Sequence, residues 1–213
     1  MTTDTVIVSR RTRKPSSLRY YQDGPPAAVD LPTWRLRLTG LGVPDREFCY
    51  DELTDLPRMS ASRRYVCVCN WSVREDWTGF LLEDLLRAAG WDGRVEDRYL
   101  RQVSIGTPEK GVYDSTIPLG PALERQAMLI DRIGGEPLPL ERGYPLRLID
   151  FGLYGYKSVK GLASLEITDK FELGIWERKA GYELDGEIQP KRYRFCDLGG
   201  HHFITGPGEV TEV

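Results

Sequence analysis

Short stretches in which every second residue is apolar limit most strongly what this 213-residue chain can fold into. Residues 33–40, with the sequence TWRLRLTG, alternate apolar side chains with arginines, and residues 64–71, RYVCVCNW, alternate valines with cysteines. A period of two places successive side chains on opposite faces of a β-strand. Turns rich in glycine and proline separate these stretches, as is typical of strand ends. We predict further strands in residues 99–106, 144–151 and 162–169.

Helical spacing of apolar residues is less frequent. In residues 79–90, GFLLEDLLRAAG, leucines recur on one helical face after a tryptophan-rich turn, and Gly90 forms a C-terminal cap. A second helix is predicted over residues 120–135, GPALERQAMLIDRIGG. Because strands outnumber helices and regular βαβ alternation is missing, we expect an α+β fold, a single β-rich mixed domain. We expect this domain to span residues 18–213 and residues 1–17 to form a flexible, charged arm.

The charge and cysteine content exclude several classes of protein. The chain has 29 Lys and Arg and 32 Asp and Glu, a net charge of −3, so neither nucleic acid nor an anionic membrane surface is an expected partner. No apolar run approaches the roughly 20 residues of a membrane-spanning helix, and no hydrophobic segment follows the arginines near the start. Four scattered cysteines are too few for a disulfide scaffold, which favours a reducing, cytoplasmic setting.

Cys67 and Cys69 are the first candidates for chemistry. The alternation around them predicts that both side chains lie on one face of a strand. Packing, a disulfide, a metal site and a nucleophile are all consistent with such a pair. The two histidines, His201 and His202, lie in a glycine-rich tail near Cys196, at a spacing that matches no standard metal site. A flexible terminus is the plainer interpretation of that tail.

A second candidate is the segment of residues 134–161, which combines glycines with cationic side chains. Its cations include Arg142, Arg147, Lys157 and Lys160. Glycines let the backbone approach a ligand closely, and fixed cations suit a phosphate or another anion. The segment contains neither a Walker loop nor a GxGxxG fingerprint. On these residues alone, an anion site and a solvated turn are equally consistent with the sequence.

In chain order, these segments resemble the sulfite oxidase family of molybdopterin enzymes, in particular small bacterial members that consist of the catalytic domain alone. Residues 67–86 are similar to the family's Cys-x-x-x-Trp-Ser element, which continues with Trp-x-Gly and leucines. Residues 113–119, YDSTIPL, are similar to its Tyr-x-x-Ser/Thr-Ile-Pro-Leu motif, and residues 138–162 to its Leu-Pro to Ser-Val-Lys segment. Residues 27–42 and residues 174–187, GIWERKAGYELDGE, complete the collinear match.

The resemblance implies roles for Cys67 and Tyr113. In the family one cysteine thiolate holds molybdenum, and Cys67 stands at the matching interval before Trp71 and Ser72. A thiolate is a soft donor that suits such a metal, and Cys69 would be a close neighbour rather than the ligand. Tyr113 matches the tyrosine beside the metal, where a phenol can hydrogen-bond an oxo group or the substrate. A tyrosine that is merely packed at a strand end is the alternative.

The resemblance also implies the cofactor, an anionic molybdopterin whose dithiolene supplies two further sulfur ligands, and no haem in this chain. The residues expected at the family's cofactor-binding positions are Asn70, Trp71, Ser72, Arg142, Arg147, Tyr156, Lys157, Ser158 and Lys160. We expect Lys157 and Lys160 to lie on a surface-facing loop that cradles the phosphate. The family's asparagine-rich start, its His before Gly-x-Pro and its Trp after Ser-Val-Lys are here residues 19–21, Arg142 and Gly161.

We therefore expect oxygen-atom transfer at a small sulfur or nitrogen centre, with a small-molecule substrate and a separate electron donor or acceptor. Sulfite oxidation calls for several cations at the pocket, and only Arg74 is an evident candidate near Cys67. Sulfite oxidation and reduction of an S- or N-oxide thus stay equally open. The departures at Arg142 and Gly161 leave an alternative, a non-catalytic relative that keeps the fold as a binding module. Retention of Cys67, Tyr113 and the basic segment argues against it.

Overall fold

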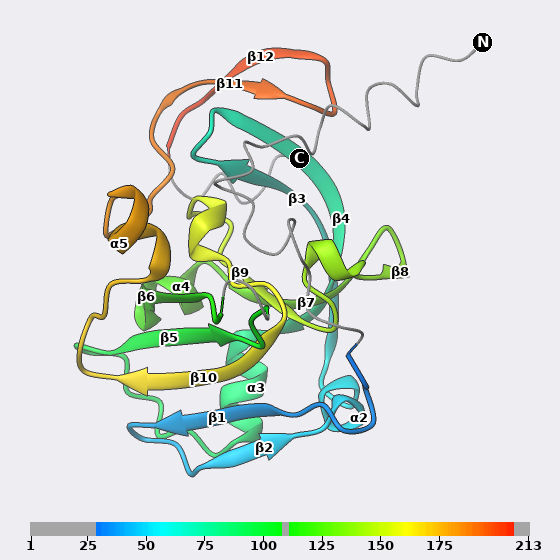
Figure 1. Ribbon diagram of the computed structural model, residues 1–213, viewed down its shortest axis with the longest axis vertical. Helices are drawn as coiled ribbons and strands as arrows, with labels where there is room; N and C mark the ends of the chain where they lie inside the picture. Colours follow the sequence, from blue (N-terminus) through cyan, green and yellow to red (C-terminus); the bar gives the residue numbers. More distant parts are fainter. Residues whose placement is uncertain (1–28, 108–110, 207–213) are drawn as a thin grey trace.

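The structure, a computed structural model, describes residues 29–107 and 111–206 and is built on two β-sheets (Figure 1). The predicted arm at residues 1–17 and the segment at residues 19–21 lie outside the described residues. The first sheet has the strand order β2-β1-β10-β5-β6, in which β1 and β10 run parallel and the other neighbours antiparallel. Its strands are β1 (Leu36–Gly40), β2 (Arg46–Phe48), β5 (Tyr99–Ser104), β6 (Asp114–Pro118) and β10 (Leu162–Thr168).

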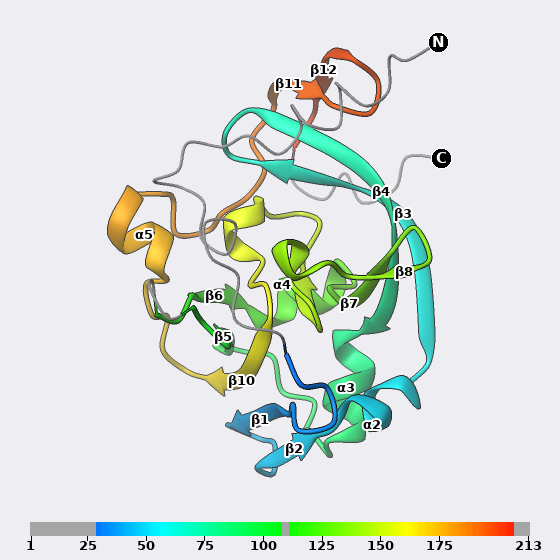
Figure 2. The same ribbon diagram turned by 45° about the vertical axis from the view of Figure 1, so that its right-hand side comes forward.

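The second sheet has the order β12-β11-β4-β7-β8, with β3 paired to β4 and β9 paired to β7. Its strands are β3 (Arg58–Cys67), β4 (Trp71–Leu81), β7 (Met128–Ile133), β8 (Glu136–Pro137), β9 (Arg147–Ile149), β11 (Lys191–Phe195) and β12 (Gly200–Ile204). β3 and β4 form a long hairpin that curves along one side of the molecule, from α2 (Tyr50–Thr54) at one end to β11 and β12 at the other (Figure 2).

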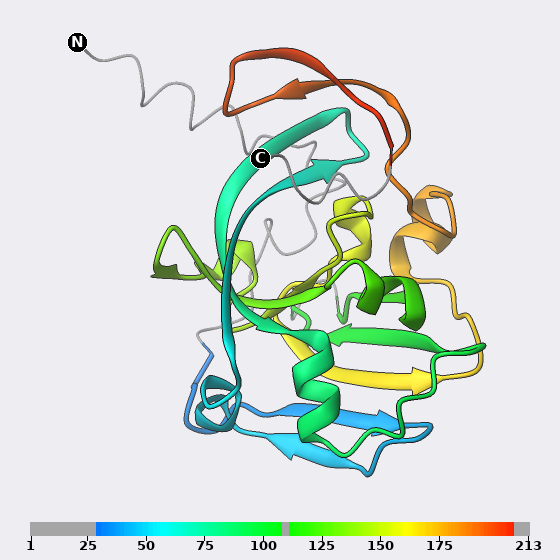
Figure 3. The same cartoon turned by 180° about the vertical axis from the view of Figure 1, so that it is seen from behind.

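The helices are short and mostly join or cover the sheets. They are α2, α3 (Leu82–Ala88), α4 (Leu119–Glu124) and α5 (Ile175–Ala180), with 3-10 turns η2 (Leu140–Arg142) and η3 (Gly155–Lys157). α3 buries Leu82, Leu85 and Leu86 in the same core cluster as Leu36 and Leu38 of β1. Figure 3 shows this helix in front of the first sheet. The helix predicted from the leucine spacing is confirmed.

The helix predicted over residues 120–135 is only half right. α4 ends at Glu124, and Met128–Ile133 form β7 instead. Between them Gln126 has a φ of 55°, a left-handed conformation that a helix cannot continue through. The apolar residues at the start of β7 are fully buried, and β7 lies between β4 and β9. Periodicity alone cannot assign so short an apolar run to a helix or a strand.

The tryptophan-rich segment predicted as a turn is in fact the 11-residue strand β4. Buried residues lie on both faces of β4, which removes the period-two signal. The turn is confined to residues 68–70, and because β3 ends at Cys67, Cys69 lies in the turn rather than on the strand face. The tail predicted as a flexible terminus contains β12, which pairs with β11 along its length.

The expected fold class, α+β and rich in strands, is confirmed. Strands occur in all five predicted stretches. The domain limits at residues 18 and 213 remain a prediction. Within the described ranges, no helix is long and apolar enough to cross a membrane.

Candidate functional site

A cavity lies where the turn of the β3–β4 hairpin meets the segments around η2, η3 and α5. Most of the site residues predicted from the sequence line it, namely Cys67, Trp71, Tyr113, Arg142, Arg147, Tyr156, Ser158 and Lys160. The other lining residues are Tyr65, Val68, Cys69, Gly155, Trp176 and Tyr182. No carboxylate is among these described lining residues. Asn70, Ser72 and Lys157, which were also predicted, are not among the lining residues.

Cys67 is presented to the cavity by the hairpin turn. It is the last residue of β3, is 4% exposed and pairs across the hairpin with Trp71. A three-residue hairpin loop commonly needs its last residue in the left-handed region, and Asn70 has a φ of 65°. The Asn70 backbone N–H donates to the Cys67 carbonyl at 3.1 Å. Asn70 is exposed, so in this structure it shapes the turn instead of lining the cavity.

Ser72 contacts a buried arginine on the other side of the hairpin. Arg64 Nη1 lies 3.3 Å from the Ser72 hydroxyl, and the same guanidinium makes two hydrogen bonds, of 2.9 and 3.0 Å, to the Asp197 carboxylate. Although burial opposes it, the bonds from Arg64 hold the pKa of Asp197 below its usual range. The Ser72 backbone carbonyl accepts from the Cys196 N–H at 2.9 Å. Ser72 thus fastens the hairpin to the segment after β11.

Arg147 is the most deeply buried cation of the cavity wall, with 2% of its surface exposed. Its Nη2 donates to the Ser158 hydroxyl at 2.8 Å and to the Tyr65 hydroxyl at 3.3 Å, and its Nη1 donates to the Arg142 carbonyl at 3.1 Å. In the part of the chain that the structure describes, no carboxylate lies within 4 Å of its guanidinium. A buried charge is costly without a counter-charge, so an anion bound at this wall would lower that cost.

Arg142 and Lys160 lie on the same wall as Arg147. Gly143, with a φ of 110°, packs so closely on Lys160 that an added Cβ would lie 2.9 Å from the Lys160 Cβ. The Lys160 ammonium donates to the Glu141 carbonyl at 2.9 Å. The predicted basic segment therefore does gather three cations at one place, from η2, β9 and the strand-like residues after η3.

Lys157 corrects one expectation. It is 2% exposed rather than surface-facing, and its ammonium lies 2.5 Å from the Glu177 carboxylate of α5. It also donates to the Thr116 carbonyl at 3.3 Å. Burial lowers the pKa of Lys157, and the bond to Glu177 opposes that shift. The short turn η3 points Lys157 into the protein, which spacing in the sequence could not reveal.

An aromatic wall also lines the cavity, and sequence reasoning found only part of it. Tyr113 packs edge-on against Trp176, with ring centroids 6.4 Å apart, and Trp176 stacks on Tyr182 at 6.1 Å. Tyr156 contacts Tyr182 at 4.9 Å. Trp176 and Tyr182 belong to the GIWERKAGYELDGE stretch, so the quoted motif was the available signal for them.

The Tyr113 phenol is 4% exposed, and burial raises its pKa well above the ordinary value, as do the nearby Tyr65 and Glu177. The phenol stays protonated and donates to the Tyr156 carbonyl. A side-chain hydrogen bond joins the phenol to Trp176. Donation to a substrate oxygen therefore requires the phenol to exchange its bond to the Tyr156 carbonyl.

Two other candidates lie away from the cavity. Arg74, the expected sulfite-binding cation, donates to the Ser62 carbonyl at 3.1 Å and is absent from the cavity lining. His201 and His202 stand on β12, and no group of three or more potential metal ligands from His, Cys, Asp and Glu occurs among the described residues. A metal site of Cys196 with the two histidines, which the sequence did not favour, is therefore not formed in that part of the chain.

The chain is similar to several known proteins. Residues 23–176 match the family described as the oxidoreductase molybdopterin binding domain. Subunit YedZ1 of Azospira oryzae is 30% identical over 78% of this chain and 61% of its own length. The protein-methionine-sulfoxide reductase catalytic subunit MsrP of Xanthomonas campestris is 26% identical over 78% of this chain and 52% of its own length. The chain thus spans between half and two thirds of these two relatives.

A solved structure shows the same fold. The sulfane dehydrogenase SoxCD from Paracoccus pantotrophus superposes with a TM-score of 0.61 over 85% of this chain and 47% of the larger one, at 20% identity. The family match and the 30% identical relative confirm the resemblance seen in the sequence. They favour an enzyme that binds Mo-molybdopterin over a non-catalytic module. The chain belongs to the sulfite oxidase-like family of molybdopterin-binding oxidoreductases.

Proposed function

We propose that this chain is the catalytic part of a reductase that removes the oxygen atom from a small S-oxide or N-oxide, with electrons from a separate donor. The observation that carries the proposal is the pair of unlike cavity walls, one cationic and one aromatic. The cationic wall suits the cofactor phosphate, which leaves the aromatic wall for a substrate without negative charge. Arg74, the additional cation expected for sulfite, lies elsewhere.

The cavity fits the cofactor of the family. Arg147 is buried without a carboxylate partner in residues 29–107 and 111–206, and a phosphate would supply the missing negative charge. Arg142 and Lys160 would add further charge-assisted bonds on the same wall, and Ser158 orients the Arg147 guanidinium. Cys67, which lines the same cavity, would hold the metal through its thiolate. When bound, the cofactor supplies two-electron redox chemistry and accepts the oxygen atom.

The residues of this chain would then bind and orient the substrate. Tyr113 would donate a hydrogen bond to the oxide oxygen, which becomes more basic as its bond to sulfur or nitrogen breaks. Trp176 and Tyr182 would enclose the apolar substituents and exclude water. For a sulfoxide, the sulfur–oxygen bond breaks as the substrate takes up two electrons and two protons, and the products are a thioether and one molecule of water. The electrons come from the donor, the protons from solvent, and the oxygen leaves as water.

The relatives support the direction and the need for a partner. MsrP is named a protein-methionine-sulfoxide reductase catalytic subunit, and YedZ1 is named a subunit. We extend reduction of a sulfoxide and dependence on a separate electron donor to this chain as a proposal. The scattered cysteines of the sequence led to the expectation of a cytoplasmic location. That location stays a prediction.

The test uses the full chain made in a host that synthesises molybdopterin. Reduced methyl viologen serves as donor for dimethyl sulfoxide, methionine sulfoxide and trimethylamine N-oxide, and ferricyanide serves as acceptor for sulfite. We expect kcat/KM for the best oxide to exceed that for sulfite by about a hundredfold or more, as one favourable contact in the transition state can provide. Cys67→Ala is the inactive control. Faster turnover of sulfite than of every oxide would contradict the proposal.

A further inference from the structure

We infer that the outer face of the β11–β12 hairpin is the docking site for an acidic electron-carrier protein. This inference rests on the proposed function, because that proposal draws its electrons from a separate donor. We call this surface the hairpin face and define it by Arg192, Arg194, His201 and Phe203.

The strand register places these four side chains on one face. Arg192 lies opposite Phe203 and Arg194 opposite His201 in the antiparallel pair, and directly opposed residues share a face. All four are exposed, and Phe203 keeps 59% of its surface accessible. The intervening Tyr193 is buried on the other face. An exposed aromatic ring between arginines is the composition that protein interfaces favour.

The charge of the hairpin is locally positive although the chain as a whole carries −3. Lys191, Arg192 and Arg194 stand on β11, and the one carboxylate in the hairpin, Asp197, is already paired with the buried Arg64. Among the described residues, no carboxylate lies within ion-pair distance of the three β11 cations. Uncompensated cations on a protein of opposite net charge attract and orient an acidic partner.

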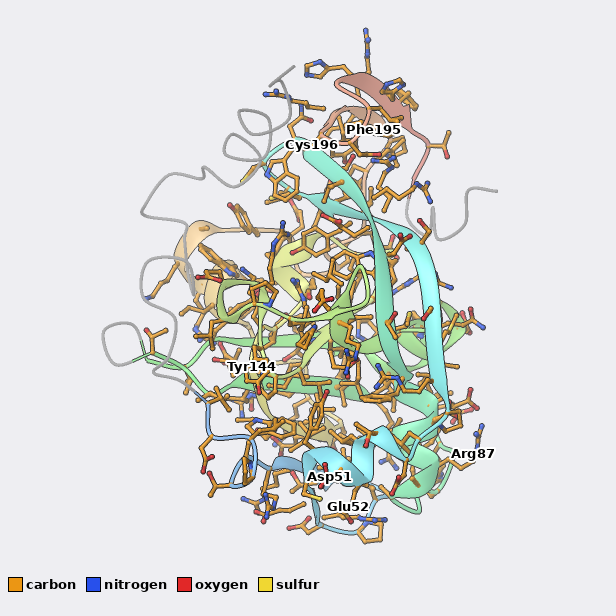
Figure 4. All side chains as sticks on the ribbon, turned by 90° about the vertical axis from the view of Figure 1, so that its right-hand side faces the viewer. Asp51, Glu52, Arg87, Tyr144, Phe195 and Cys196 are labelled. Atoms are coloured by element: carbon orange, nitrogen blue, oxygen red, sulfur yellow. The ribbon has the colours of Figure 1, made fainter. Side chains whose placement is uncertain are left out.

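The hairpin face adjoins the turn that presents Cys67. β11 runs parallel to the start of β4, with Arg194 opposite Trp71, which lines the cavity. The Arg194 backbone N–H donates to the Asn70 carbonyl at 3.1 Å. Figure 4 shows Phe195 and Cys196 at this end of the molecule and Arg87 at the opposite end. A carrier on the hairpin face would therefore sit next to the strand pair that holds the proposed metal ligand.

The size of the charged cluster favours a protein over a membrane surface. Recognition of anionic lipids typically uses clusters of about 4–8 Lys and Arg, whereas β11 carries three. Encounters between redox proteins, in contrast, use small and weakly bound interfaces. We therefore commit to an acidic carrier protein as the occupant, and an anionic membrane becomes an outcome of the test.

The test measures binding of a plant-type ferredoxin, an acidic one-electron carrier, to the full-length holoprotein by isothermal titration at about 20 and 200 mM salt, conditions in which screening differs strongly. We expect the affinity of the wild type to fall several-fold at the higher salt. Arg192→Glu/Arg194→Glu should weaken binding about tenfold or more at low salt. The control Arg87→Glu/Arg94→Glu makes the same change in net charge at other exposed sites and should bind like the wild type.

Three outcomes would overturn the inference. These are absence of ferredoxin binding at low salt, equal weakening in the hairpin and control variants, and binding of the wild type to phosphatidylserine vesicles but not to ferredoxin. Turnover with reduced methyl viologen is measured in parallel and should be unchanged in Arg192→Glu/Arg194→Glu. Any of these three outcomes, with viologen turnover intact, refutes the docking site alone. Absence of viologen turnover in every protein refutes the proposed function instead.

Discussion

Replacing Lys157 with Met should destabilise the protein far more than the same replacement at Lys160. The Lys157 ammonium and the Glu177 carboxylate are 2.5 Å apart, and their side chains are 1% and 2% exposed. The second carboxylate oxygen of Glu177 already has no hydrogen-bond partner among the described residues. In Lys157→Met the carboxylate would therefore stay buried with no cation beside it.

The size of the loss follows from the cost of a buried unpaired charge. Removing one partner of a buried ion pair costs about 3–5 kcal/mol, whereas replacing both partners with apolar residues of similar volume is often neutral. Solvent screening does not reduce this figure, because both side chains are almost inaccessible. For a chain of this length each kcal/mol shifts Tm by roughly 2–4 °C, so Lys157→Met should lower Tm by about 6–20 °C. Lys157→Met/Glu177→Met should recover most of the loss.

Urea unfolding followed by circular dichroism measures these differences. Because a bound cofactor stabilises the folded state, the molybdenum content of each variant is determined and compared at equal loading. Lys160→Met is the matched control, since its half-exposed ammonium donates to a backbone carbonyl and should contribute about 1 kcal/mol or less. Equal losses at the two lysines, or a double variant as unstable as Lys157→Met, would refute the reasoning.

Three further outcomes are expected. Cys67→Ala should contain almost no molybdenum by elemental analysis whereas Cys69→Ala keeps most of it, and equal content would remove Cys67 as the ligand. Tyr113→Phe should keep its molybdenum but lose roughly a hundredfold in kcat/KM, the usual cost of a donor aimed at transition-state charge, and unchanged kinetics would leave the phenol a packing role. Because the pKa of Asp197 is held down in the folded state, its pair with Arg64 adds stability above the unfolded pKa of about 3.9 and loses it as the pH falls further. Asp197→Asn should flatten the acid limb of a urea midpoint against pH profile, and an unchanged limb would contradict this assignment.

The strands were predictable where one face is exposed to solvent and the other is buried. Leu36 and Leu38 are fully buried while the adjacent Arg35 and Arg37 are exposed, as the alternation requires. The pairing of strands was not predictable, because a period of two says nothing about the partner. β1 pairs with β10 and β11 with β4, and each pair joins segments more than a hundred residues apart. Such long-range pairs form only when the whole core assembles.

The site was predictable to the extent that one short segment decides it. Cys67 lies in a predicted strand and lines the cavity, whereas the turn at residues 68–70, which places it opposite Trp71, was not predicted. The burial of Lys157 depends on its ion pair with Glu177, twenty residues further along the chain, and the sequence near Lys157 does not indicate that partner. Trp176 was missed for the same reason, because it reaches the cavity only when α5 packs against the segment of Tyr113.

Arg147 explains why stability and cofactor binding should be linked in this protein. Arg147 is 2% exposed, and its guanidinium donates hydrogen bonds to the neutral Ser158 and Tyr65 hydroxyls and to the Arg142 carbonyl. These groups accept the hydrogen bonds but do not balance the positive charge. Folding without an anion therefore carries part of the cost of burying an unpaired charge. A phosphate bound at this wall removes that cost in the folded state alone, because the unfolded chain has no such wall. Binding to the folded state alone raises stability by mass action, so the arrangement that holds the cofactor also makes the loaded protein the more stable one.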